Sequence, residues 1–155
     1  MITVNRASQQ DLNAELSLLI ENACMDIELN LEYNAISKYF SGTAAALGVS
    51  LLLDDYVAFI IRSKDEPIGM MMFSEEYIHY MNCKCIIERF IYIRPEYRSY
   101  TTVVKLVKDS LSLIKDMYNE PVIVFAGNIL GNHNVQVVYK RLGFTQVGTN
   151  LIKEL

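Results

Sequence analysis

The residues with the clearest chemistry in this sequence follow Pro95: an arginine, Arg98, and then several hydroxyl side chains suited to beginning a helix. The segment 86–93 before them is apolar and aromatic, which is typical of a buried strand. Pro95 should end that strand because proline cannot donate a ladder hydrogen bond. A helix is expected from about Thr101 to Met117. The first N–H groups of a helix lack intrahelical partners and carry partial positive charge, so this junction is suited to bind an anion. The stretch by itself is equally compatible with an arginine that only faces solvent.

A second group of reactive side chains comprises Cys83 and Cys85, with His79 and His133 as possible companions. The spacing matches no common zinc pattern, so buried thiols are favoured and no metal site is predicted. The three cysteines cannot all pair within one chain. No apolar leader opens the sequence, and no apolar run approaches the length of a membrane span. We therefore expect a protein of the reducing cytoplasm with no membrane partner.

The composition describes one folded domain. The chain has 155 residues, of which 52% are hydrophobic and 21% charged, and this excludes a disordered class. The length suffices for one domain with a real core and is too short for two. The formal net charge of −4 argues against non-specific binding to nucleic acid and is compatible with a cationic or amine-bearing partner.

The first elements that position these residues are a strand and two helical regions. Residues 1–7 predict the strand, and Ser8 is a suitable N-cap for a helix over about 10–24. A less regular helical region follows over about 32–47. Its apolar stripe consists of Tyr33, Ile36, Tyr39 and Phe40. Such a stripe is usually core, and the alternative is that Tyr33 or Tyr39 faces a substrate.

A hairpin and three further strand or helix patterns complete the chain. The hairpin has strands at 56–62 and 67–73 around a turn at 63–66, and Gly69 indicates a bulge or a close backbone approach. The later elements are expected at 86–93 (strand), 101–117 (helix), 122–126 (strand), about 135–142 (helix) and 146–152 (strand).

The last of these helices has recognisable ends. Asn132 or Asn134 can cap its start, while Gly143 fits its C-terminal cap with Phe144 as the hydrophobic contact. The whole order, β-α-α-β-β-β-α-β-α-β, predicts one α/β domain. We expect a mixed, mostly antiparallel sheet of about six strands with about four helices.

Two segments resemble the GNAT superfamily of acyl-CoA-dependent N-acetyltransferases. Residues 91–98, IYIRPEYR, are similar to the strand that ends in V-x-P-x-Y-R before that family's pyrophosphate loop. Residues 132–144, NHNVQVVYKRLGF, resemble the family's N-x-x-A-x-x-L-Y-x-K-L-G-F helix and turn. The hairpin with Gly69 and the order of elements also agree with the family fold. The resemblance implies a single GNAT-like acetyltransferase domain over residues 1–155.

The resemblance implies acetyl-CoA as a co-substrate, with its pyrophosphate on the loop and its pantetheine arm along a strand edge. The cofactor-binding residues expected from it are Ile91, Tyr92, Ile93, Arg98, Ser99, Tyr100, Thr101, Thr102, Val103 and Asn132. The loop departs from the family pattern R/Q-x-x-G-x-G/A, because Thr101 and Val103 stand where small residues are expected. Either the loop keeps negative φ throughout, with hydroxyl groups assisting, or the cofactor binds weakly or not at all.

The resemblance also implies two catalytic residues. Tyr139 would protonate the leaving thiolate, a role that suits a phenol whose pKa is near 10, and its alternative is a packed helix aromatic. Glu88 is the candidate general base, since a carboxylate on an apolar strand is costly unless it is paired or functional. Its alternatives are exposure at a strand end or an ion pair with Arg89 or Arg94. Arg89 is a poor partner because strand neighbours point oppositely.

The leading hypothesis is an N-acetyltransferase that acts on a primary amine of a small molecule or a protein by direct attack in a ternary complex. The alternative is a catalytically inactive acyl-CoA-binding or structural module that keeps the fold. In this family the acceptor is set largely by the first two helices, here about residues 24–47. Asp26, Glu28 and Glu32 either attract a cationic amine there or form a solvated acidic face. A homodimer is a further expectation.

Overall fold

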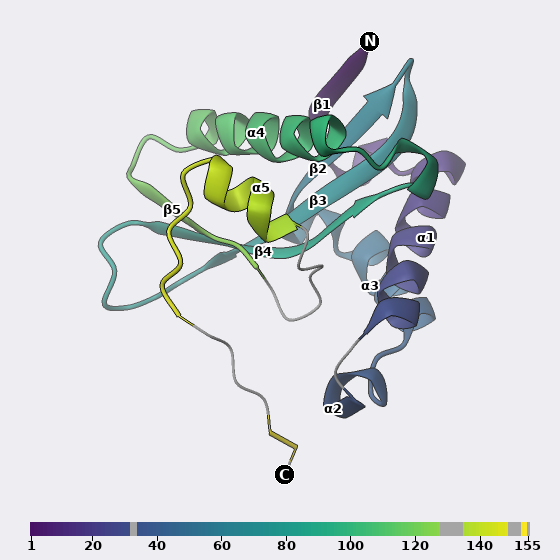
Figure 1. Cartoon of the computed structure of the whole chain (residues 1–155), viewed down its shortest axis with the longest axis horizontal. Coiled ribbons are helices and arrows are strands. Elements are labelled where there is room, and N and C mark those ends of the chain that lie inside the picture. The colour runs from purple at the N-terminus through teal and green to yellow at the C-terminus, as the bar shows by residue number, and fades with distance from the viewer. Residues whose placement is uncertain (32–33, 128–134, 149–152, 155) are drawn as a thin grey trace.

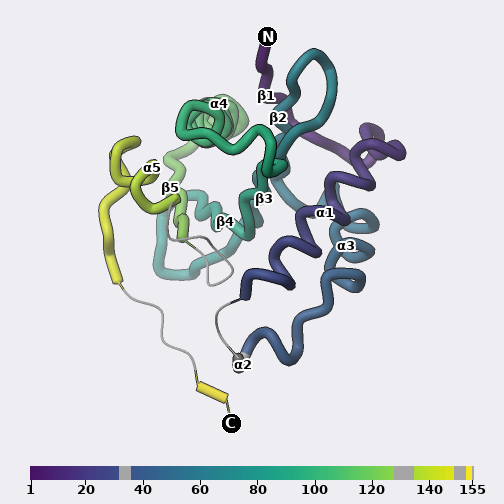
Figure 2. The backbone as a smooth tube through the Cα atoms, turned by 45° about the vertical axis from the view of Figure 1, so that its right-hand side comes forward, coloured from purple at the N-terminus to yellow at the C-terminus, as the bar shows by residue number. Residues whose placement is uncertain are grey.

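One sheet runs through the middle of the molecule and separates two groups of helices (Figures 1 and 2). The computed structural model describes residues 1–31, 34–127, 135–148 and 153–154. The strands within them are β1 (Ile2–Ala7), β2 (Val57–Ser63), β3 (Glu66–Glu76), β4 (Lys84–Ile93) and β5 (Val122–Phe125). The α-helices are α1 (Ala14–Asn30), α2 (Asn34–Ser37), α3 (Gly42–Leu51), α4 (Tyr100–Met117) and α5 (Val135–Arg141). Strands β1 to β4 are antiparallel neighbours and β5 is parallel to β4, so the predicted mixed α/β sheet is confirmed.

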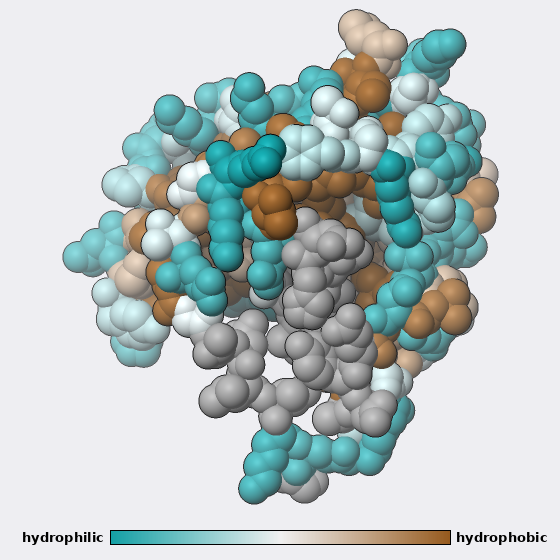
Figure 3. All heavy atoms as spheres, viewed as in Figure 1, coloured by the Kyte–Doolittle hydropathy of each residue, from teal (hydrophilic) through white to brown (hydrophobic). Residues whose placement is uncertain are grey.

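Both faces of the central strands are covered, which explains the nearly continuous apolar runs in β2 and β3. In β2, Ala58 and Ile60 belong to the core cluster that includes residues of α1 and α3. Phe59 and Ile61 point the opposite way and pack with residues of α4 and α5. In the view of Figure 3, hydrophilic residues line the outer side of α4 and hydrophobic residues gather beneath it. The sheet therefore has a core on each face, and the face on which a side chain lies decides which helices it contacts.

The first helix begins later than predicted. Ser8 caps a short 3-10 turn at Gln9–Asp11, because the Asp11 carboxylate accepts the Ser8 backbone N–H at 2.7 Å and closes the turn. Asn13 is the N-cap of α1, and its side chain accepts from the Leu16 N–H at 2.9 Å. The helix then continues to Asn30, beyond the predicted end near residue 24.

The predicted helical region over 32–47 is two helices. Ser41 starts α3 as a new N-cap, with its hydroxyl accepting from the Ala44 N–H at 3.3 Å. Tyr39 is 71% exposed and donates its hydroxyl to Glu154 at 2.9 Å, so the prediction that the stripe is core is wrong for this residue. Tyr33 lies outside the described residues. No helix in the described part of the chain is long and apolar enough to cross a membrane.

The predicted hairpin is confirmed, with a tighter turn. Lys64 and Asp65 have φ values of 48° and 71°, the left-handed pair typical of a two-residue hairpin turn. The close approach expected at Gly69 is also confirmed. A Cβ there would lie 2.6 Å from the Tyr92 backbone oxygen, closer than atoms can approach. Glycine at this position therefore lets β3 and β4 pair closely.

The end of α5 follows the prediction closely. Gly143 has a φ of 93°, which a glycine adopts without strain. The Phe144 N–H donates to the Tyr139 carbonyl at 3.0 Å and the Gly143 N–H to Lys140 at 3.2 Å, the two bonds of a Schellman motif. The strand predicted at 146–152 is not formed over 146–148, and residues 149–152 lie outside the described part of the chain. Five of the expected six strands are therefore described.

Candidate functional site

Half of strand β4 has a neighbour on one side only. Strand β5 pairs with β4 over the four residues from Lys84 to Ile87. Within the described chain, no strand pairs with β4 on that side from residue 88 to residue 93, a segment we call the open edge. An unpaired edge presents backbone N–H and C=O groups that need partners. The open edge therefore offers hydrogen bonds to an extended ligand.

The backbone groups at this edge come from alternate residues. The Arg94 N–H donates to the Ile68 carbonyl on β3 at 2.8 Å, so the backbone of Ile93 and, two residues before it, of Ile91 faces away from β3. The Tyr92 carbonyl faces β3 at Gly69. The expected backbone contacts to a cofactor arm are thus geometrically available at Ile91 and Ile93. They are unavailable at Tyr92, because backbone groups of successive strand residues point to opposite sides and those of Tyr92 point toward β3.

Helix α4 begins directly beyond the end of the open edge. Ser99 is its N-cap, and the Ser99 hydroxyl accepts from the Thr102 N–H at 3.1 Å and lies 2.8 Å from the Thr102 hydroxyl. Residues 98–103 all have negative φ, since Lys64 and Asp65 are the described non-glycine residues with positive φ. The segment therefore keeps negative φ throughout, as the first of the two alternatives left open by the sequence requires. The N–H groups of Tyr100 and Thr101 have no hydrogen-bond partner among the described residues.

Arg98 connects the open edge to helix α1. Its Nε donates to the Ile93 carbonyl at 2.7 Å, and its Nη2 lies 3.2 Å from a carboxylate oxygen of Asp26. Its guanidinium carbon also lies 5.6 Å from the centre of the Tyr92 ring. The side chain is 45% exposed, so the guanidinium can still present donors to an anion while these contacts hold its position.

A second arginine lies on the other side of this helix start. Arg141 of α5 donates from Nη1 to the Tyr100 hydroxyl at 3.0 Å, and its guanidinium carbon lies 5.2 Å from the ring centre. Sequence reasoning missed Arg141 because helical periodicity selects apolar positions. The signal that could have found it was its place next to Tyr139 in the family-like segment. Positive charge therefore flanks the first turn of α4, from Arg98 just before the helix and from Arg141 of α5.

The two predicted catalytic side chains are brought together by a bulge. Phe73 of β3 pairs with Glu88, while Met72 pairs with Phe90, so Arg89 is an extra residue in β4. The bulge reverses the alternation of faces. Glu88 faces the side of α5 like its neighbour Phe73, whereas Phe90 belongs to the core cluster on the α1 side.

Tyr139 donates its hydroxyl to Glu88 Oε2 at 2.8 Å, and both side chains are buried, with 5% and 2% exposure. The Gly127 N–H donates to the same carboxylate oxygen at 2.9 Å. The Tyr139 ring lies 5.1 Å from the ring of Phe144, so the turn that ends α5 also holds the phenol in place. The two side chains are within the hydrogen-bond distance that a proton transfer between them requires.

Burial, reinforced by the Glu88 carboxylate, raises the pKa of Tyr139 above its usual range. The phenol is therefore protonated at neutral pH and available as a donor. The ion-pair alternatives for Glu88 are not formed with its neighbours: Arg89 binds Ser74 and Glu76, and Arg94 binds Glu66 and Glu96. Exposure at a strand end is excluded by burial.

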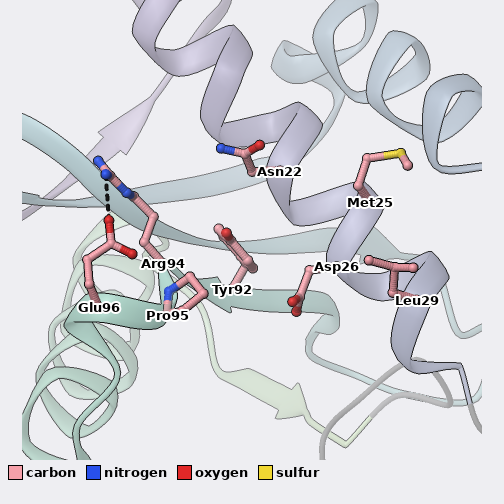
Figure 4. A pocket seen from close by; sticks show the side chains of 8 residues that line it. All are labelled: Asn22, Met25, Asp26, Leu29, Tyr92, Arg94, Pro95 and Glu96. Carbon is pink, nitrogen blue, oxygen red and sulfur yellow. Dashed lines mark ion pairs between the residues drawn. The ribbon is translucent and has the colours of Figure 1, made fainter.

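A pocket of about 370 Å³ lies between the C-terminal half of α1 and the end of β4 (Figure 4). Its lining residues are Asn22, Met25, Asp26, Leu29, Tyr92, Arg94, Pro95 and Glu96. The pocket is on the α1 side of β4, opposite the side that Glu88 and Tyr139 share. Arg98 lies next to the pocket, because it forms an ion pair with the lining residue Asp26.

The remaining predicted residues are placed as follows. Cys85 is a buried thiol, as expected, whereas Cys83, for which burial was also expected, is half-buried; Cys24 is buried as well. Burial raises the pKa of Cys24 to about 11, which disfavours the reactive thiolate. The described residues contain no group of three metal-ligating side chains. Asn132 and His133 lie outside the described residues, so the expected contact of Asn132 stays a prediction.

Comparison with known proteins identifies the fold that this arrangement of strands and helices forms. No protein-family model matches the sequence, and no curated protein matches it at a significant level. Solved structures do match over the full chain. A possible acetyltransferase from Clostridium difficile 630 has 17% identity and a TM-score of 0.68, covering 99% of this chain and 97% of that one. A GCN5-related N-acetyltransferase from Ralstonia eutropha JMP134 has 11% identity and a TM-score of 0.73, covering 100% and 99%.

A third match was solved with acetyl-CoA. This predicted acetyltransferase from Clostridium acetobutylicum has 14% identity and a TM-score of 0.63, covering 99% of this chain and 96% of that one. At such identities a likeness concerns the path of the backbone, and it agrees here with the order of elements in the sequence. The chain therefore has the fold of the GNAT superfamily of N-acetyltransferases.

Proposed function

We propose that this protein transfers an acetyl group from acetyl-CoA to a primary amine by direct attack in a ternary complex. One observation carries the proposal. The open edge of β4 has an anion-binding helix start with two flanking arginines at one end, and the hydrogen-bonded pair of Tyr139 and Glu88 at the other. A ligand with a phosphate group, an extended amide-bearing arm and a reactive thioester matches that order of features.

The binding part rests on the first turn of α4. The N–H groups of Tyr100 and Thr101, with the helix dipole, would hold the pyrophosphate, and Arg98 and Arg141 would add charge from either side. The backbone of Ile91 and Ile93 would pair with the amide groups of the arm. From residue 88 to 93 the strand spans roughly 16 Å, which the arm must bridge.

The chemical part rests on the short contact between Tyr139 and Glu88. The amine nitrogen forms a bond to the thioester carbon, the carbon–sulfur bond breaks, and the amine proton passes to Glu88. A protonated carboxyl is a donor, so Glu88 then donates to the Tyr139 oxygen. That exchange turns the phenol proton toward the departing sulfur, which leaves as a thiol. The proton lost by the amine thus ends on sulfur, and both side chains return to their starting states.

The proposal is tested by two measurements on the purified protein. Calorimetric titration with acetyl-CoA should give binding in the micromolar range. When acetyl-CoA and the protein are then incubated with each of a panel of primary amines, free CoA thiol should be released. Failure to bind at millimolar ligand would contradict the cofactor assignment.

One observation favours a second candidate, an acyl-CoA-binding module without turnover. Arg98 is engaged by Asp26, and the β-branched residues Thr101 and Val103 stand in the first turn of α4, where the family pattern has small residues. Binding of acetyl-CoA without thiol release for any amine would support this candidate over the first.

A further inference from the structure

The pocket between α1 and the end of β4 is not used by the chemistry proposed above. It opens on the α1 side of the sheet, and the open edge of β4 connects that side with Glu88 and Tyr139 on the other. Figure 4 shows Tyr92 rising from the strand toward α1, with Asn22 above it and Asp26 beside it on the helix.

Tyr92 is the feature of the pocket that points to a ligand. Its side chain is 7% exposed and lines the pocket, and its hydroxyl makes no hydrogen bond with any described residue. Among the described residues, Ser110 Oγ is the one buried side-chain polar atom without a partner, so the Tyr92 hydroxyl is open to water in the pocket. A polar group of a ligand in the pocket could replace that water and take over its hydrogen bond with Tyr92.

The charges around the pocket indicate the sign of that group. Asp26 and Glu96 line it from opposite sides. Arg94 is committed to Glu66 and Glu96, and the Arg94 guanidinium also lies over the Tyr97 ring. Arg98 is the counter-ion of Asp26, and it is also the arginine placed to meet a phosphate at the start of α4. A diphosphate at that helix start would share Arg98 and leave Asp26 available to another cation.

We propose that this pocket receives a second cationic group of the acceptor, held by Asp26 and the Tyr92 hydroxyl, and that the acceptors are aliphatic diamines or polyamines. This inference rests on the proposed acetyl transfer and names its substrate class. Met25 and Leu29 provide apolar contact for the methylene chain. Tyr92 lies four residues along β4 from Glu88, roughly 13 Å at strand spacing and less across the bulge. The two amino groups must therefore be separated by several methylene groups.

The test uses hexamethylenediamine and hexylamine, which share one carbon chain and differ in the second amine. The unmodified protein should show a kcat/KM for the diamine about tenfold or more above that for hexylamine, as expected for a hydrogen bond between charged groups. Asp26→Asn should lower the ratio of kcat/KM for the diamine to kcat/KM for hexylamine toward one, and this ratio is independent of any effect on acetyl-CoA binding through Arg98. Tyr92→Phe should reduce the preference in part. Glu21→Gln, on an exposed site of the same helix, is the matched control and should keep it.

Calorimetric binding of hexamethylenediamine, with and without desulfo-CoA, gives a readout that needs no turnover. Binding should be tighter with desulfo-CoA present and weaker in Asp26→Asn than in Glu21→Gln. Equal diamine affinity in these two variants, or equal kcat/KM for both amines in the unmodified protein, would overturn the inference. Absence of desulfo-CoA binding or of thiol release would instead contradict the proposed function, so the two failures are distinguishable.

Discussion

Removing the hydroxyl of Tyr139 is the most informative single change in this protein. Tyr139→Phe deletes the donor of the 2.8 Å hydrogen bond to Glu88 and leaves the ring and its contact with Phe144 in place. The carboxylate remains buried and keeps the Gly127 N–H as a partner. Loss of a buried hydrogen bond to a carboxylate costs about 1.5–3 kcal/mol. For a chain of this size that corresponds to a fall in Tm of roughly 3–12 °C.

The effect on activity should be larger than the effect on stability. Loss of a general acid lowers kcat by about 10²–10⁴-fold. Affinity for acetyl-CoA should be unchanged, because Tyr139 lies at the opposite end of the open edge from the arginines of the helix start. Thermal unfolding, calorimetry with acetyl-CoA and thiol release would measure these three quantities separately.

Glu88→Gln is the matched variant, since its side-chain carbonyl can still accept the Tyr139 hydroxyl. It should lose less stability than Tyr139→Phe and a comparable amount of turnover. Because the pair passes one proton, the double variant should be little slower than either single variant. The proton path would be refuted if the fold losses in turnover of the two single variants multiplied in the double variant. It would also be refuted if Tyr139→Phe left kcat unchanged.

The same residue sets a pH dependence of stability. Its pKa is raised in the folded protein, chiefly by burial, above the value near 10 that it has in an unfolded chain. The unfolded chain therefore releases this proton first. The contribution to unfolding free energy is fully present below about pH 10 and falls above it by about 1.4 kcal/mol per pH unit. Urea unfolding should show a flatter alkaline limb for Tyr139→Phe than for the unmodified protein, and identical limbs would contradict the assignment.

Three further experiments test other parts of the structure. Arg98→Ala should weaken acetyl-CoA binding about tenfold or more through loss of a charge-assisted contact, and Arg141→Ala should weaken it less; calorimetry that finds both variants unchanged would place the phosphates elsewhere. Gly69→Ala should lower the unfolding free energy by about 1–3 kcal/mol in urea titrations, because its Cβ would meet a backbone oxygen of β4 at 2.6 Å, and a neutral effect would mean that the strands can separate. In thiol labelling of the native protein, half-buried Cys83 should react before buried Cys24, and the reverse order would contradict the burial described here.

Much of the fold was determined by patterns between residues close in sequence. The apolar strand before Pro95, the amphipathic face of α4 and the turn at Gly143 each depend on near neighbours, so periodicity and turn chemistry predicted them. Where two local signals competed, the prediction was wrong. Ser8 and Asn13 can both cap a helix, and the bond from Asp11 back to Ser8 decided between them.

The sequence by itself selected Glu88, Arg98 and Tyr139 as candidates, because a carboxylate on an apolar strand, an arginine before a helix and a tyrosine in a family-like segment are visible without coordinates. Tertiary structure alone decided what each one contacts. The bulge at Arg89 turns Glu88 toward Tyr139, and the packing of α1 brings Asp26 to Arg98. The physical reason is that strand register and helix docking are set by pairing between distant segments, whereas a sequence pattern records only the preferences of neighbours along the chain.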